Sequence, residues 1–412
     1  MKKLKIAVFH NLPAGGALKA LHDNIHILKD NGHHVDVYTT DTSNSSFVSL
    51  DSYSDNVFVY PVKRRKIRNF IFKTIEKLVP STKFIERVFI RYSDFVDVQK
   101  KIAIDIDSRN YDLVLLEQDH LFALSPAILK YLKTLKVYYC QQPYRQNEMI
   151  LMKLMDEFNR TFRQKISFKL FDEKYLKLDV EYAQFTDYML CNSYFSHENL
   201  LRSYGINASV SYLGIDIDQF YPMNIPRKNI VLSVGSISPN KGFDFVIRSI
   251  SKVDKDIRPK FIIVGYSGNN ICVNKIKTLA KDLDVELEIL SGISYDELIK
   301  LYNEVKMVIF APYLEPFGLV PLEASACGTP VIGVKEGGVK ETVMHMKNGL
   351  LLERNEFIFA EGITELLLNQ DLWNKISKEG PTFVNNYWTL KHAGERLLNH
   401  FYRILDEENK NR

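Results

Sequence analysis

The strongest constraint on the fold is an alternation that runs twice along the chain. Short apolar runs are each followed by a longer stretch in which apolar residues have helical spacing, starting at Leu4 and starting again at Asn229. A parallel strand covered on both faces has a continuous apolar sequence, and a helix returns the chain to the same end of the sheet. The sequence therefore predicts an α/β chain with two Rossmann-like, doubly wound parallel-sheet domains that face a central cleft. The predicted strands are Leu4–Phe9, Val35–Thr39, Tyr111–Leu116, Lys136–Cys140, Asp187–Asn192 and Ser209–Leu213, then Asn229–Val234, Lys260–Gly265, Val285–Leu290, Met307–Ala311 and Thr329–Val334.

Two domains also suit the length of 412 residues, which exceeds that of one ordinary domain. The segment that carries Pro222 and Pro226 is the best linker between them. We predict a first domain at 1–213, a linker at 214–228, a second domain at 229–389 and a C-terminal helix at 390–412.

Charge and composition argue against several classes of protein. Lys and Arg number 54 against 50 Asp and Glu, a net charge of +4, so no nucleic-acid partner is expected. The four cysteines form no Cys-x-x-Cys pair, which favours reduced, buried thiols in a cytoplasmic protein without a zinc site. We expect neither a signal peptide nor a transmembrane helix, because no apolar run reaches about 18 residues.

One segment departs from the even charge balance. Residues 63–101 hold twelve basic and four acidic side chains, interleaved with apolar ones. Such a segment is typical of a peripheral contact with anionic lipid at the inner face of a membrane, and equally of a solvated helical face. Both interpretations are open from the sequence.

The stretch from Glu315 to Glu323 is the most informative for chemistry. Its two carboxylates are separated by seven residues, the first in a loop after a predicted strand and the second inside the following helix. The backbone N–H groups of Phe317, Gly318 and Leu319 lie at the start of that helix, where anionic oxygens are favoured. Glycine at the helix start also allows close approach of a ligand to the backbone.

Three motifs in this part of the chain together resemble a known family. They are the Glu-x7-Glu segment, the run Cys327-Gly-Thr-Pro, and Gly337-Gly-Val-Lys-Glu341, all in order. This combination resembles the retaining sugar-nucleotide glycosyltransferases of family 4, which have the GT-B fold. The resemblance covers nearly the whole chain and implies that the last helix crosses back to the first domain, which would form the acceptor side. The second domain would then bind the nucleotide-sugar donor.

The resemblance also implies roles for individual residues. Glu315 would hold sugar hydroxyls, Lys241 would meet the diphosphate, and His120 would face the donor sugar. Glu323 would accept from the ribose hydroxyls, with the nucleotide base near Gly265 and Ile293. The implied catalytic residues are Glu315, Lys241 and His120, and the implied donor-binding residues are Gly15, Gly16, Ser236, Lys241, Phe317, Gly318, Leu319, Glu323 and Ile293.

The implied reaction moves a hexose-type sugar from a nucleotide donor, most often UDP- or GDP-linked, to an acceptor hydroxyl with retained configuration. A leaving diphosphate gains charge in the transition state, and Lys241 with the backbone dipoles could stabilise it without a metal or another cofactor. The departing phosphate oxygen would help to deprotonate the acceptor. A glycan, a lipid-linked glycan or a protein-bound sugar all suit the acceptor, and many relatives act in polysaccharide biosynthesis.

Departures from the family pattern keep two alternatives open. Ser236 stands where the family usually has Arg, and Gln141-Gln142 stand where it usually has His-Thr. A catalytically weak GT-B accessory or binding subunit is one alternative. Another GT-B enzyme, such as a sugar-nucleotide epimerase or a phosphorylase, is the other.

Overall fold

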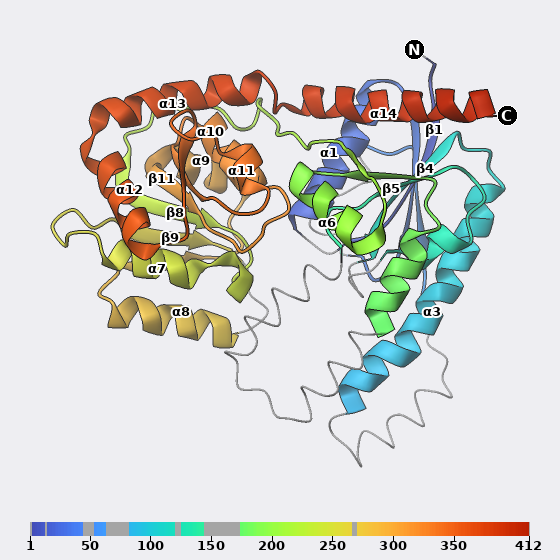
Figure 1. Cartoon of the computed structure of the whole chain (residues 1–412), viewed down its shortest axis with the longest axis horizontal. Coiled ribbons are helices and arrows are strands. Elements are labelled where there is room, and N and C mark those ends of the chain that lie inside the picture. The colour runs from blue at the N-terminus through green and yellow to red at the C-terminus, as the bar shows by residue number, and fades with distance from the viewer. Residues whose placement is uncertain are drawn as a thin grey trace.

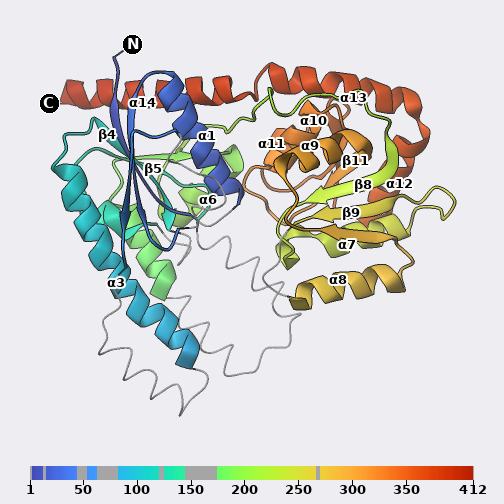
Figure 2. The same ribbon diagram turned by 180° about the vertical axis from the view of Figure 1, so that it is seen from behind.

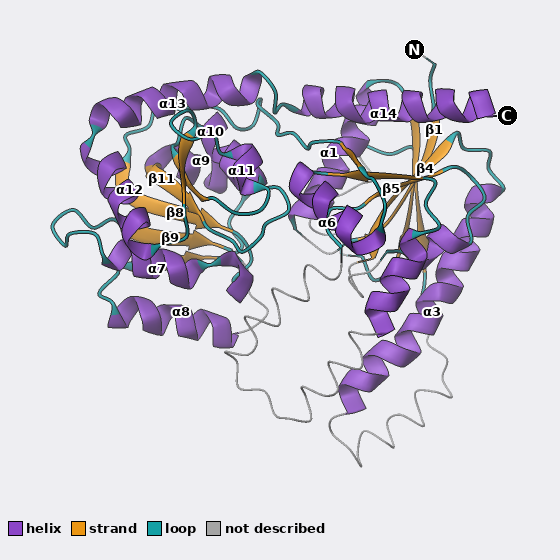
Figure 3. Ribbon diagram, viewed as in Figure 1, coloured by secondary structure: helices purple, strands orange, loops and turns teal. Residues whose placement is uncertain are grey.

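The structure is a computed structural model, and it describes residues 2–12, 15–43, 53–62, 82–119, 125–143, 174–265 and 270–411. Its described strands form two separate parallel sheets, one in each half of the chain (Figure 1). Helices cover both faces of each sheet (Figure 3). The prediction of two doubly wound parallel-sheet domains is therefore confirmed, whereas the residue boundaries of the domains stay a prediction.

The first sheet has seven strands in the order β3-β2-β1-β4-β5-β6-β7. The order reverses between β1 and β4, which pair from Ile6 with Leu113 to Asn11 with Asp119, with a register shift between Phe9 and Asn11. The strands are β1 (Lys5–Asn11), β2 (His34–Thr40), β3 (Asn56–Tyr60), β4 (Leu113–Asp119), β5 (Lys136–Tyr139), β6 (Tyr188–Cys191) and β7 (Ser209–Val210). The helices are α1 (Gly16–Asp30), α3 (Thr82–Asp107), the 3-10 turn η1 (Ala127–Lys130) and α6 (Tyr194–Tyr204), and residues 174–183 are helical as well.

The second sheet repeats this topology with six strands in the order β10-β9-β8-β11-β12-β13. The strands are β8 (Lys228–Val234), β9 (Lys260–Val264), β10 (Leu287–Leu290), β11 (Val305–Phe310), β12 (Val331–Val334) and β13 (Gly349–Leu352). The helices are η2 (Pro239–Lys241), α7 (Phe243–Ser251), α8 (Asn270–Asp282), α9 (Tyr295–Glu304), α10 (Leu319–Ala326), α11 (Val339–Thr342), α12 (Glu356–Leu368), α13 (Gln370–Asn385) and α14 (Leu390–Asn411). Sheets of this kind bind ligands at the carboxyl ends of the strands where the order reverses, here β1/β4 and β8/β11.

Two edge strands were not predicted from the sequence. Strand β3 has no fully buried residue, and Val59 is 56% exposed, so its sequence lacks the buried-strand pattern. Strand β13 has only four residues and begins with Gly349. The half-solvated β3 therefore escapes a search for continuous apolar runs, whereas β13 is such a run, Gly-Leu-Leu-Leu, and was missed because it is only four residues long.

The last helix connects the two domains. Figure 2 shows α13 over the second domain and α14 continuing along the first, beside α1. The contact is close, because a Cβ on Gly394 of α14 would lie 2.0 Å from a methyl carbon of Ile27. A backbone hydrogen bond of 2.9 Å from Ile215 to Trp388 also joins the interdomain segment to the start of this helix.

The basic segment is described only in part. Residues 63–81 lie outside the described residues, and the remainder enters α3. Among the described helices, none is both long and apolar enough to cross a lipid bilayer.

Candidate active site

An ion pair lies at the carboxyl end of the second sheet, at the reversal point between β8 and β11. Lys241 Nζ is 2.8 Å from Glu315 Oε2, and each side chain is about one-fifth exposed. Lys241 ends the turn η2 after β8, and Glu315 lies in the loop after β11. The backbone joins the two loops, because Tyr313 N–H donates to Asn240 O at 2.8 Å. The structure therefore brings together two predicted catalytic residues that are 74 positions apart.

The loop that carries Glu315 rests on the Gly337-Gly338 pair. Gly338 N–H donates to Glu315 O at 2.8 Å. A Cβ on Gly338 would lie 2.2 Å from Pro316 O, and one on Gly337 would lie 2.6 Å from Glu315 O. Only glycine allows the two backbones to approach this closely. This motif therefore positions the loop.

Helix α10 begins directly after this loop, with Gly318 at φ 111° as its N-cap. The first N–H groups of a helix point outward from its start, and the binding of an anion by those of α10 stays a prediction. The Phe317 side chain is 3% exposed and packs near Tyr212 and Trp388, with ring centroids 6.0 and 5.7 Å away. Phe317 can therefore offer a ligand its backbone, while its ring belongs to the core between the domains.

The second carboxylate of the motif, Glu323, is 6% exposed and accepts a hydrogen bond of 2.8 Å from Tyr302 OH. Burial raises the pKa of Glu323, and the positive charge of Lys19 opposes this shift. Lys19 lies on α1 of the first domain, 2.8 Å from Asp23 and 5.8 Å from the centre of the Tyr295 ring. The first domain therefore contributes a cation to this part of the site, which the sequence analysis did not identify.

The two domains are also joined beside the Glu315 loop. The Glu341 carboxylate accepts from the backbone N–H groups of Tyr194 and Phe195, at 2.9 and 3.0 Å, and from Tyr212 OH at 2.6 Å. Those N–H groups start helix α6, whose positive end favours a carboxylate. Ser193 Oγ donates to Pro316 O at 2.5 Å. The Gly-Gly-x-x-Glu motif thus links the first domain to the loop of Glu315.

The other predicted donor-binding residues lie at strand ends. Gly15 is the N-cap of α1 with open space where a Cβ would stand, and the same space is open at Gly16. A Cβ on Gly235, which precedes the exposed Ser236, would lie 3.6 Å from the Lys241 side chain. Ile293 is half-buried before α9. The predicted catalytic residue His120 lies outside the described residues, and its role stays a prediction.

Residues that could hold a metal ion do not gather in the described ranges, where no group of three or more His, Cys, Asp or Glu has a suitable arrangement.

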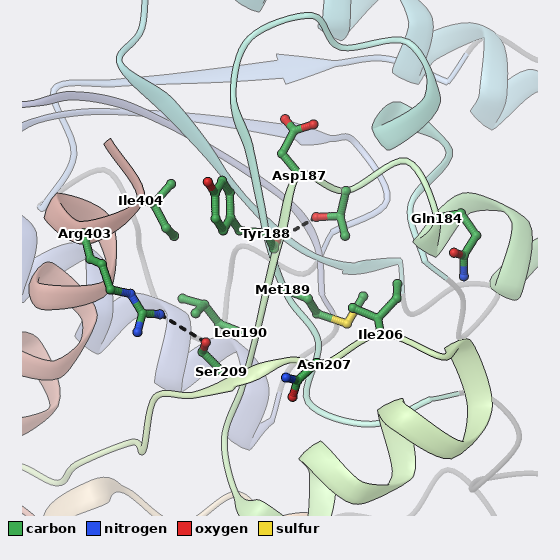
Figure 4. A pocket seen from close by; sticks show the side chains of 11 residues that line it. Gln184, Asp187, Tyr188, Met189, Leu190, Ile206, Asn207, Ser209, Arg403 and Ile404 are labelled. Atoms are coloured by element: carbon green, nitrogen blue, oxygen red, sulfur yellow. Dashed lines mark hydrogen bonds between the residues drawn. The ribbon is translucent and has the colours of Figure 1, made fainter. Parts of the chain in front are cut away.

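A cavity of about 300 Å³ lies elsewhere, beside the start of β6 and α14 (Figure 4). Its lining includes Tyr188, Asp187 and Arg403, and Arg403 donates to Ser209 Oγ at 3.2 Å. None of the predicted site residues lines this cavity.

Comparison with known proteins relates the second domain to sugar transfer. Residues 218–383 match the sequence model of a family described as glycosyl transferases group 1. An uncharacterized glycosyltransferase of Methanocaldococcus jannaschii is 30% identical over 204 residues, which cover 49% of this chain and 56% of that protein. A D-inositol 3-phosphate glycosyltransferase of Corynebacterium jeikeium is 27% identical over 216 residues, 47% of this chain and 50% of that protein. The chain thus spans about half the length of the curated relatives it matches.

Solved structures extend the likeness to both domains. The Anabaena protein HepE, in complex with UDP and glucose, is similar with a TM-score of 0.72 at 17% identity, covering 97% of this chain and 100% of that chain. The predicted GT-B fold is therefore confirmed.

Proposed function

We propose that this protein is a glycosyltransferase that moves a hexose-type sugar from a nucleotide donor, UDP- or GDP-linked, to a hydroxyl group of an acceptor. The observation that carries the proposal is the pair of Lys241 and Glu315, held 2.8 Å apart beside the N-terminus of α10. The match of residues 218–383 to glycosyl transferases group 1 and the likeness to a UDP complex support it.

The chemistry of each group suits one part of a nucleotide sugar. A diphosphate leaving group needs cations and N–H dipoles, which Lys241 and the start of α10 supply. Sugar hydroxyls need acceptors, which the Glu315 carboxylate supplies. In the structure these two groups neutralise each other, and a donor would exchange that contact for one contact to each group.

We further propose retention of configuration without a metal. The departing phosphate oxygen would lie on the same face as the incoming hydroxyl and accept its proton, while Lys241 compensates the charge on the diphosphate. This proposal assigns the stabilisation of charge to fixed protein groups. The acceptor we propose is a glycan, free or carried by a lipid or a protein.

Thermal unfolding with UDP, GDP, ADP, CDP and dTDP tests the donor class. A nucleotide at 100 times its dissociation constant adds about 2.7 kcal/mol to the stability, which raises the midpoint by roughly 5–10 °C. Lys241→Met should lose most of this shift. Release of UDP from UDP-glucose, with and without chelator, then tests turnover.

Each outcome separates one alternative. Turnover that chelator abolishes would overturn the metal-free mechanism. Binding without turnover of any donor, with every glycan acceptor tested, would favour an accessory subunit, for which the exposed Ser236 in place of a phosphate-binding Arg is the supporting observation. No response to any nucleotide would refute the proposal.

A further inference from the structure

Polar side chains follow one another across the carboxyl ends of the first sheet, on one face. His10 on β1 and Glu117 on β4 each stand two residues after core residues of the face that packs on α1, Val8 and Leu115. Side chains alternate along a strand, which places His10 on this face, and the 3.5 Å contact of Glu117 with Gln141 places Glu117 there as well. The register between β1 and β4 shifts after Phe9, and Asp119 beyond this shift lies on the opposite face. Gln141, two residues after Tyr139 of the same core, continues the row beyond β5. The row lies where ligands bind in sheets of this topology.

The opposite face of the same strand ends is different. There Asn11 Nδ2 donates to Asp119 Oδ1 at 2.9 Å, and Gln99 Nε2 donates to Asp119 Oδ2 at 2.8 Å. Gln99 Oε1 in turn accepts from the backbone N–H of Ile128 at 2.8 Å. Buried polar groups are nearly always satisfied in this way.

The row on the α1 face leaves two buried atoms without a partner. Leu12 N–H donates to His10 Nδ1 at 3.4 Å, so the hydrogen of the neutral ring lies on Nε2. His10 Nε2 and Glu117 Oε1 have no hydrogen-bond partner among the described residues, although the two side chains belong to residues that are only 2% and 1% exposed. Glu117 Oε2 makes one long contact, 3.5 Å from Gln141 Nε2.

We propose that His10 and Glu117 form a subsite that binds an uncharged hydroxyl group of the acceptor sugar. The His10 Nε2–H group donates to the hydroxyl oxygen, and the hydroxyl hydrogen is donated to Glu117. Neighbouring strands are about 4.8 Å apart, which lets both side chains reach one oxygen. This inference rests on the proposed function and adds the chemical class of the acceptor group that enters the first domain.

The charge state of the pair selects a neutral ligand. Burial lowers the pKa of His10 to about 4 and raises the pKa of Glu117 well above its usual range. His10 is therefore neutral near pH 7, and the Glu117 carboxyl group supplies no positive charge, so the pair offers no cation to a phosphate or a carboxylate. An anionic sugar would enter this subsite without compensation of its charge, whereas a hydroxyl group would satisfy both orphaned atoms.

The test uses the whole 412-residue chain loaded with UDP. Saturation-transfer NMR measures binding of methyl glycosides of glucose, mannose and galactose, and of glucuronate as the anionic counterpart, each at tens of millimolar. Glu117→Met and His10→Phe should each weaken binding of the preferred uncharged glycoside by tenfold or more. Gln99→Met is the matched control, because it replaces a buried, satisfied polar group on the opposite face by an isostere; it should leave glycoside binding unchanged.

Thermal midpoints separate a binding role from a structural one. Replacing an orphaned polar group by an apolar one leaves the midpoint unchanged or raises it, whereas Gln99→Met should lower it. The inference is overturned if no uncharged glycoside binds, if glucuronate is preferred, or if Glu117→Met binds glycosides as the wild type does. A drop in the midpoint of Glu117→Met as large as that of Gln99→Met would assign the pair to an internal water instead. Failure of the wild type to bind any nucleotide would instead refute the proposed function.

Discussion

The contact between Lys241 and Glu315 predicts that its two halves affect UDP binding in opposite directions. In the structure each side chain is the partner of the other, at 2.8 Å. UDP carries the diphosphate and lacks the sugar, so it uses the lysine and gains nothing from the carboxylate. Lys241→Met should therefore weaken UDP, and Glu315→Gln should strengthen it, although both variants lose sugar transfer.

The geometry sets the size of each effect. A charge-assisted hydrogen bond contributes about 1.5–3 kcal/mol, so Lys241→Met should raise the dissociation constant of UDP by roughly 10- to 150-fold. An ion pair whose side chains keep about one-fifth of their surface in water is worth about 1 kcal/mol. UDP no longer has to displace this contact in Glu315→Gln, and its dissociation constant should fall by roughly fivefold.

Isothermal titration calorimetry with UDP at fixed ionic strength measures both constants. Lys255 and Asp284 form the control, because their ion pair of 2.7 Å lies in the same domain with both side chains 73% exposed. Asp284→Asn should leave UDP affinity unchanged. The gain in Glu315→Gln should shrink as salt screens the pair. A Glu315→Gln variant that binds UDP as weakly as Lys241→Met would refute the reasoning, because the carboxylate would then support phosphate binding.

Three further predictions concern the link between the domains, the loop packing and the pH dependence. Glu341→Ala removes three hydrogen bonds between the domains, and denaturant titration should show a free energy of unfolding lower by about 1–3 kcal/mol. The same variant should lose more in the rate of sugar transfer than in UDP affinity. Gly338→Ala places a Cβ 2.2 Å from a carbonyl oxygen and should lower both the midpoint of thermal unfolding and UDP affinity. Gly16→Ala has open space at its Cβ, so it should neither lower the midpoint of thermal unfolding nor disturb the fold. The folded-state pKa of His10 is lowered to about 4, so the unfolded chain takes up a proton first as the pH falls. The free energy of unfolding should therefore decline between about pH 6.5 and pH 4, by up to roughly 1.4 kcal/mol per pH unit. His10→Phe should flatten this decline when thermal melts are measured as a function of pH.

The sequence was sufficient to predict the two sheets and the residues that meet at the end of the second one. Buried parallel strands are apolar throughout, so the interior strands of both sheets stand out as runs. Glu315 and Lys241 follow two such strands that flank the reversal of strand order, and parallel strands end at the same edge. Their meeting at 2.8 Å is thus a consequence of topology, which the strand pattern already contains.

Other features depend on contacts that no local pattern encodes. Lys19 looks like a surface residue of an amphipathic helix, and only the packing of the domains places it near Glu323. Glu341 is part of a recognisable motif, but its partners are backbone N–H groups of another domain. Glu117 lies at the end of an apolar run, and its significance appears only when its oxygen is found buried and unpaired. A polar residue that ends a buried strand is the one sequence signal that could have identified it.

The polar groups on the donor side of the proposed site have protein partners, whereas those on the acceptor side do not, and this difference bears on selectivity. On the donor side Lys241 pairs with Glu315, and Glu323 accepts from Tyr302, so a ligand contact to any of these side chains replaces one that already exists. The contact that is replaced reduces the net gain from each of them, and discrimination among donors must accumulate over many contacts. On the acceptor side an entering hydroxyl satisfies atoms that were buried without partners, and a ligand without that hydroxyl leaves them orphaned. Sites built in this way reject analogues that lack the group far more strongly than they reject ones that differ in size. We therefore expect loss of a single acceptor hydroxyl to cost more in transfer rate than loss of a single hydroxyl from the donor sugar.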